Sequence, residues 1–135
     1  MNVLVDTSVW SLALRRRRTS SNEIVAELVK LIREGRVLML GAIRQEILSG
    51  IRDTVQFETL RERLRDFPDL DLDAADYEEA AACFNRCRSR GIQGSNTDLL
   101  MCSVALRYEV PIFTTDEDFG NYEPILGMGL HALRG

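Results

Sequence analysis

Short apolar runs alternate along the chain with longer segments whose apolar residues recur at helical spacing. Five runs are short enough to be strands, and they lie at residues 3–5, 37–40, 70–72, 110–114 and 130–133. Strands that alternate with helices are typical of a parallel sheet covered on both faces. The pattern therefore predicts an α/β protein, a three-layer α/β/α sandwich around a central, mostly parallel sheet of four to five strands.

The segments between these runs carry the signals of helices. Apolar residues three and four positions apart predict a buried face, and a Gly or Pro just beyond the last turn predicts the end of each helix. The expected helices follow Asp6 and cover residues 22–34, 42–49, 54–67, 73–90 and 97–108. Because no linker, repeat or low-complexity tract interrupts this order, we expect a single domain over residues 1–135.

Composition narrows the class of protein. The chain has 135 residues, 45% of them hydrophobic and 28% charged, as in an ordinary globular domain. Its apolar runs are far shorter than a membrane span, and its start lacks the pattern of an export signal, so we expect a cytoplasmic protein with no membrane contact. Free thiols are the expected state of Cys83, Cys87 and Cys102. A net charge of −4 argues against a protein that coats nucleic acid electrostatically.

The chemistry of the chain is expected where its first strand ends. Val3, Leu4 and Val5 suit a strand buried on both faces, and Asp6 follows at once. In open α/β sheets, ligands bind beyond the carboxyl ends of the strands. Asp6 is therefore either a residue of such a site or a simple cap of the following helix.

Three further acids are expected to share that rim. Asp116 also follows a strand, Glu46 lies at the edge of the apolar face of a helix, and Asp98 lies in a first helical turn. Each has an ordinary alternative: a turn acid, a solvated carboxylate, and a capping box with Ser95. Carboxylates that converge on one rim need a neutralising partner, and without His or Cys nearby that partner is a hard cation, Mg²⁺ or Mn²⁺.

With these acids in place, the sequence resembles the PIN-domain ribonucleases, and more narrowly the VapC toxins of toxin–antitoxin pairs. The resemblance spans nearly the whole chain and rests on four motifs in order: V-L-V-D-T-S at 3–8, A-I-R-Q-E-I-L-S-G at 42–50, T-D-L-L-M-C-S-V-A at 97–105 and I-F-T-T-D-E-D-F at 112–119. It implies a catalytic site of Asp6, Glu46, Asp98 and Asp116, with the metal held by Asp6, Asp98 and Asp116. The supporting residues it implies are Thr7, Ser8, Asn96, Thr115 and Asp118.

The resemblance also implies an activity and partners. The expected protein is a Mg²⁺-dependent endoribonuclease that acts on RNA, forms a homodimer and is bound by a cognate VapB-like antitoxin. The antitoxin would lay a helix in a groove near the first helices, where Trp10 and Leu14 are candidates, although core packing is an equal alternative for Trp10. A solitary PIN nuclease and an inactive PIN-fold binding module remain as alternatives.

Two other classes fit the sequence poorly. A signalling receiver domain needs a lysine after a late strand, whereas the only lysine is Lys30. A phosphatase of the haloacid dehalogenase type needs a second aspartate where Ser8 stands. The run Arg15–Arg18 and Arg44 are kept as candidate phosphate contacts, and the single histidine, His131, is expected to be structural.

Overall fold

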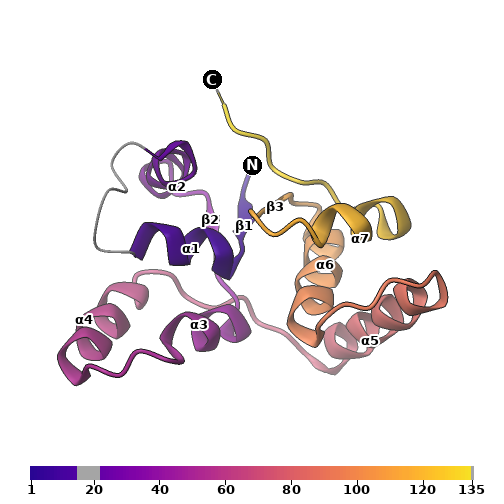
Figure 1. Ribbon diagram of the computed structural model, residues 1–135, viewed down its shortest axis with the longest axis horizontal. Helices are drawn as coiled ribbons and strands as arrows, with labels where there is room; N and C mark the ends of the chain where they lie inside the picture. Colours follow the sequence, from indigo (N-terminus) through magenta and orange to yellow (C-terminus); the bar gives the residue numbers. More distant parts are fainter. Residues whose placement is uncertain (15–21, 135) are drawn as a thin grey trace.

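The computed structural model describes residues 1–14 and 22–134 (Figure 1). Its strands are β1 (Val3–Val5), β2 (Val37–Leu38) and β3 (Ile112–Phe113). Its helices are α1 (Thr7–Leu14), α2 (Glu23–Arg33), α3 (Gly41–Leu48), α4 (Thr54–Leu64), α5 (Ala74–Ser89), α6 (Asn96–Tyr108) and α7 (Phe119–Leu126). The arginine run at 15–18 lies outside the described residues.

The sheet is parallel throughout, in the order β2-β1-β3. In Figure 1 the helices α1–α4 lie on one side of the strands and α5–α7 on the other. The central strand β1 is fully buried, with Val3, Leu4 and Val5 all 0% exposed. A continuous apolar run is stable there because both of its faces are covered by helices. The predicted three-layer α/β/α sandwich is thereby confirmed.

The sheet has three strands, so the prediction of four to five was wrong in number. The runs at 70–72 and 130–133 lie beside the sheet but form no strand: a single parallel bridge joins Met39 to Asp69, just before the first run, and another joins Ile112 to Leu130 in the second. The first run ends because α5 begins directly after it, at the capping residue Asp73. The second leaves the sheet edge because His131 and Arg134 are bound by a glutamate of α2.

Helix α7 was missed by the sequence pattern. It contains Pro124, which removes a backbone donor and argues against a helix. Its buried residues Phe119, Tyr122 and Leu126 lie three and four positions apart. This spacing was the available signal, and burial of that apolar face against α5 and α6 stabilises the helix in spite of its proline.

The side chain of Arg44 is hydrogen-bonded within the protein. Its guanidinium donates to the carboxylate of Asp69 at 3.0 Å and to the carbonyl of Leu64 at 2.9 Å, and it also contacts the carbonyl of Phe67. These contacts join α3 to the last residue of α4 and to the segment that follows it. Because its donors are used within the protein, Arg44 is not a good candidate for a phosphate contact.

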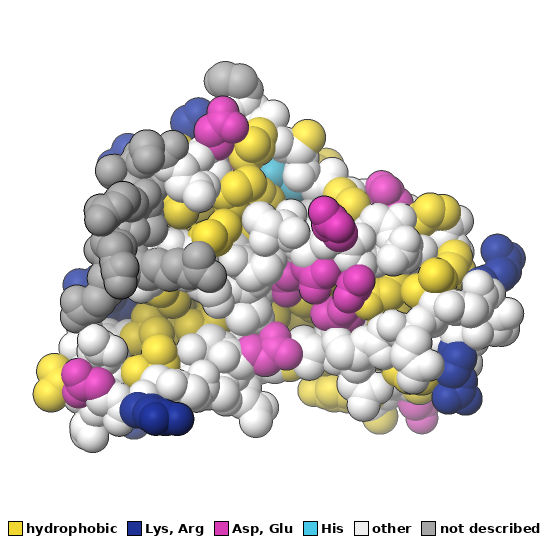
Figure 2. Space-filling model, viewed as in Figure 1, with side chains coloured by type: hydrophobic (Ala, Val, Ile, Leu, Met, Phe, Trp, Pro, Cys, Tyr) yellow, Lys and Arg dark blue, Asp and Glu magenta, His cyan; other side chains and the backbone are white. Residues whose placement is uncertain are grey.

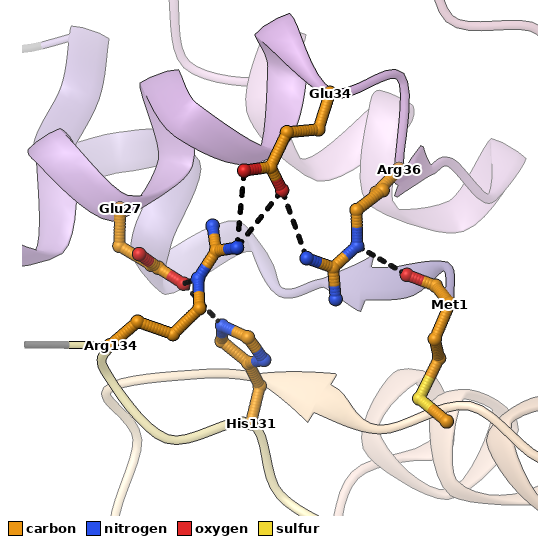
Figure 3. Close-up of polar contacts among 6 residues, drawn as sticks. All are labelled: Met1, Glu27, Glu34, Arg36, His131 and Arg134. Carbon is orange, nitrogen blue, oxygen red and sulfur yellow. Dashed lines mark hydrogen bonds and ion pairs between the residues drawn. The ribbon is translucent and has the colours of Figure 1, made fainter.

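The end of the chain is fastened to α2 (Figure 3). Glu27, 2% exposed, lies 2.6 Å from Nε2 of His131 and accepts a hydrogen bond from Nε of Arg134 at 2.7 Å. Arg134 also pairs with Glu34, which binds Arg36 in turn. His131 therefore has a role consistent with the structural one expected.

Among the helices of the described part of the chain, none is long and apolar enough to cross a membrane.

Candidate metal centre

Asp6 lies where β1 passes into α1, and its carboxylate is held by three groups. Oδ1 accepts the N–H of Thr7 at 2.8 Å, and Oδ2 accepts the hydroxyls of Ser8 and Thr114, both at 2.8 Å. The residue is 6% exposed. A buried carboxylate with this many donors keeps one orientation, so Asp6 is a preorganised group at the rim of the sheet.

The segment after β3 is attached to the same point. The N–H of Thr115 donates to the hydroxyl of Ser8 at 3.0 Å, and that of Asp116 donates to the hydroxyl of Thr114 at 2.9 Å. Ser8 and Thr114 thus connect the carboxyl ends of β1 and β3. The rule that parallel strands end at one rim predicted this proximity correctly for Asp6 and Asp116.

Three acids form a compact group at this rim, and it contains Asp118, which was expected only as a supporting residue, in place of Asp6. Asp98, Asp116 and Asp118 each offer an oxygen, and these oxygens all lie within 4.8 Å of one another. The Asp118 N–H also donates to Oδ1 of Asp116 at 2.9 Å, which fixes the turn before α7. Figure 2 shows acidic side chains gathered near the centre of the face in view.

Asp98 is held by the N-cap of its own helix, α6, and by a residue of α7. Its N–H donates to the hydroxyl of Ser95 at 3.0 Å, which is the first half of the capping box expected there. The carboxylate, however, accepts the phenol of Tyr122 at 2.7 Å. Burial raises the pKa of Asp98, and the charges of Asp6 and Asp116 raise it further, against the lowering effect of the Tyr122 and Ser95 hydrogen bonds.

Glu46 is connected to the rim through Thr7, whose hydroxyl donates to its Oε1 at 2.7 Å. It is exposed and lies outside the group of three acids. Asn96 is exposed at the start of α6, and no hydrogen bond of the described residues joins it to the acids. Thr115 contributes its N–H to the arrangement rather than its hydroxyl.

Two residues of the site were missed by the sequence reasoning, Thr114 and Tyr122. The pattern places Thr114 at the end of a strand, two residues before Asp116, and a hydroxyl at that position was a usable signal. Tyr122 is on the helix that was not predicted. Nothing local in the sequence places its phenol beside Asp98, so only the packing of α7 reveals it.

The donor set fits a hard divalent cation. The group of three contains carboxylate oxygens alone, which Mg²⁺ and Mn²⁺ prefer over nitrogen and sulfur ligands. Burial is the main cause of the raised pKa of Asp98, and the nearby charges of Asp6 and Asp116 add to it. A divalent ion would offset these negative charges, and Asp98, Asp116 and Asp118, with Asp6 beside them, would hold it.

Ser8 offers a direct test of the connection between β1 and β3. Replacing Ser8 with Ala removes its hydrogen bond to the Asp6 carboxylate and the acceptor for the Thr115 N–H. We expect a loss of about 1–2 kcal/mol in the free energy of unfolding, measured in urea. Ser11→Ala, at an exposed position of the same helix, is the matched control and should change it by less than about 0.5 kcal/mol. Equal stabilities of the two variants would contradict this role of Ser8.

Comparisons with known proteins agree with this fold. The family model for the PIN domain matches residues 3–123. VapC ribonuclease Mb1587 of Mycobacterium bovis and ribonuclease VapC11 of Mycobacterium tuberculosis are each 31% identical over 121 residues, which are 87% of this chain and 88% of theirs. The chain therefore belongs to the PIN-domain family. Both of these relatives within the family are named VapC ribonucleases.

Solved structures show the same fold. FitAcB from Neisseria gonorrhoeae has a TM-score of 0.76 at 20% identity and covers 96% of both chains. VapBC2 from Rickettsia felis, bound to a DNA fragment from its promoter, also has a TM-score of 0.76, at 16% identity, and covers 97% of this chain and 98% of its own. At these identities the likeness concerns the fold alone.

Proposed function

We propose that the protein is a metal-dependent endoribonuclease of the VapC type. The observation that carries the proposal is the group formed by Asp98, Asp116 and Asp118, whose oxygens lie within 4.8 Å of one another beside the buried Asp6. Carboxylates this close to one another repel, and a divalent cation would relieve that repulsion. The place of this group at the rim of a PIN-domain sheet, in a chain whose relatives are named ribonucleases, supports phosphodiester hydrolysis.

The residues of the site would have different roles in hydrolysis. When bound, Mg²⁺ or Mn²⁺ lowers the pKa of a water molecule and stabilises charge on the phosphate. Ser8 and Thr114 hold the Asp6 carboxylate in one orientation, so that it would help to hold a cation with little reorganisation. Glu46 is exposed, and the Thr7 hydroxyl holds one of its carboxylate oxygens. Its other carboxylate oxygen would accept a proton from water at the rim.

Other sources of catalysis are poorly supported in the described residues. His131 is engaged with Glu27, so it does not serve as a general base at the acids. The alternative of an inactive PIN-fold binding module is disfavoured because Asp6, Glu46, Asp98 and Asp116 are all present, and three of them meet closely enough to share electrostatic effects.

The proposal is tested by RNA cleavage with the purified chain. Fluorescently labelled RNA should be cut in the presence of Mg²⁺ or Mn²⁺, cutting should stop when EDTA is added, and it should return when the metal is restored in excess. Cleavage that continues undiminished in EDTA would show a metal-independent nuclease, and the proposed role of the acids would be wrong.

We further propose a homodimer and a VapB-like antitoxin as partners. Leu14, at the end of α1, lines a cavity of about 490 Å³ with Ile51, Val55 and Leu60, among others. Val55 is 72% exposed, so this face carries apolar surface that a partner helix would cover. Trp10, by contrast, is 4% exposed and packs edge-on against Phe67, which favours the core role for it.

The partners are tested by co-expression. A small protein encoded beside this chain should co-purify with it, and Val55→Glu should weaken that complex while the chain itself stays folded. Light scattering of the free chain should give the mass of a dimer. A monomer that co-purifies with no neighbour would favour the solitary nuclease.

A further inference from the structure

Tyr122 makes a contact that its position in the core does not by itself require. The side chain is 1% exposed, and its phenol donates to Oδ2 of Asp98 at 2.7 Å. A buried hydroxyl needs a partner, but a backbone carbonyl would serve that purpose as well. Here the partner is one of the acids of the proposed metal centre, so the orientation of a candidate ligand depends on α7.

The tyrosine is rigidly placed for this contact. Its ring packs edge-on against Phe119, with ring centroids 5.2 Å apart. The phenol hydroxyl donates its hydrogen to the carboxylate, because an ionised carboxylate can only accept. A tyrosine has few side-chain torsions, and close packing of the ring fixes them at small entropic cost.

Gly94 provides the space that the tyrosine needs. A Cβ atom at this position would lie 2.9 Å from the Tyr122 hydroxyl oxygen and 2.3 Å from Cδ2 of Leu99. Both distances are too short for real contacts, so any larger residue would displace the phenol or the leucine. The turn before α6 is thus shaped around the contact between Tyr122 and Asp98.

We propose that Tyr122 is a positioning residue for Asp98. Its phenol keeps Oδ2 of the Asp98 carboxylate turned toward α7 and leaves Oδ1 to bind the cation. This inference rests on the proposed metal-dependent function. Without the phenol, the Asp98 carboxylate would lose its hydrogen bond to α7, and the negative charges of Asp6 and Asp116 would favour its turning away from the other acids. Gly94 acts through Tyr122 and has no contact with the cation.

The test compares Mn²⁺ affinity with stability in Tyr122→Phe, which removes one oxygen and keeps the ring. Calorimetric titration of the full chain should show Mn²⁺ binding weakened about 10-fold. The unfolding midpoint in EDTA should change little, since Asp98 can then turn toward water. Raising the Mn²⁺ concentration should restore cleavage of RNA. Tyr77→Phe, at a residue 56% exposed, is the matched control and should bind Mn²⁺ as the wild-type chain does.

Glycine variants test the same contact from its other side. Gly94→Ala should weaken Mn²⁺ binding in the same direction, whereas Gly120→Ala, whose added methyl group meets nothing within 4 Å, should leave it unchanged. If Gly94→Ala does not fold, the Mn²⁺ affinity of Tyr122→Phe is the test of the proposal.

The outcomes separate the two proposals. Wild-type affinity for Mn²⁺ in Tyr122→Phe, with or without a loss of stability, would make the tyrosine a purely structural residue and overturn this inference alone. Absence of Mn²⁺ binding by the wild-type chain would overturn both the inference and the proposed function.

Discussion

Replacing Asp98 with Asn is expected to abolish RNA cleavage and to make the metal-free protein more stable. The amide keeps the size of the side chain and can still accept the Tyr122 hydrogen bond, so the fold should persist. It loses the charge that binds a cation, and cleavage should fall on the order of 10³-fold. Stability should rise because the substitution removes a desolvated charge that Asp6 and Asp116 repel.

The pH dependence of this gain has a definite sign. Folding raises the pKa of Asp98, so the charged form costs stability above that pKa, and the cost disappears as the pH falls and the group becomes protonated. The difference in unfolding midpoint between Asp98→Asn and wild type, measured in EDTA, should therefore be largest near neutral pH and should shrink in acid. Added Mg²⁺ should stabilise the wild-type chain and leave the variant unchanged.

The exposed Asp71 supplies the control. Asp71→Asn removes the same charge away from the described carboxylate group, so cleavage and metal-induced stabilisation should both remain. Full cleavage by Asp98→Asn would contradict its assignment as a metal ligand.

The sequence predicted the centre of the fold better than its edges. The run Val3–Val5 has no polar residue on either face, which is the signature of a central parallel strand, and it is the central strand. The runs at 70–72 and 130–133 also looked like strands, but each lies beside a single bridge. A helix cap ends the first of these runs and a link to α2 draws the second away from the sheet, and neither feature is visible in the hydrophobic pattern.

In the candidate site, too, some residues could be predicted from the sequence and others could not. Asp6 and Asp116 could be placed at one rim because strand ends in a parallel sheet share a rim, a rule that needs no knowledge of packing. Tyr122 could not be placed, because its contact with Asp98 depends on how α7 packs on α5 and α6. The strand-end rule places some acids at the rim, but it gave no reason to prefer Asp118 over Glu46 as a member of the compact group. The residues that orient the acids come from distant elements whose positions only tertiary structure determines.

Replacing Glu27 with Gln is expected to cost about 2–3 kcal/mol in the free energy of unfolding at pH 7. The carboxylate is 2% exposed and shares one oxygen between His131 and Arg134. Arg134 is 39% exposed, so water screens part of its interaction, and the buried contact with His131, 9% exposed, accounts for most of the loss. The amide keeps the shape of the side chain but leaves the groups that fasten residues 131–134 to α2 without their negative partner.

The dependence of the free energy of unfolding on pH, below neutral pH, tests the same contact independently. Burial acts to raise the pKa of Glu27, but the hydrogen bonds and charges of His131 and Arg134 outweigh burial, so folding lowers the pKa. Glu27 therefore adds stability above its unfolded pKa, and this contribution is lost as the pH falls through the lower, folded pKa. Urea unfolding of wild type and Glu27→Gln should diverge at neutral pH and converge in acid. Glu23→Gln, exposed on the same helix, should follow wild type throughout, and a Glu27→Gln curve parallel to wild type at every pH would show that the carboxylate charge does not hold the end of the chain.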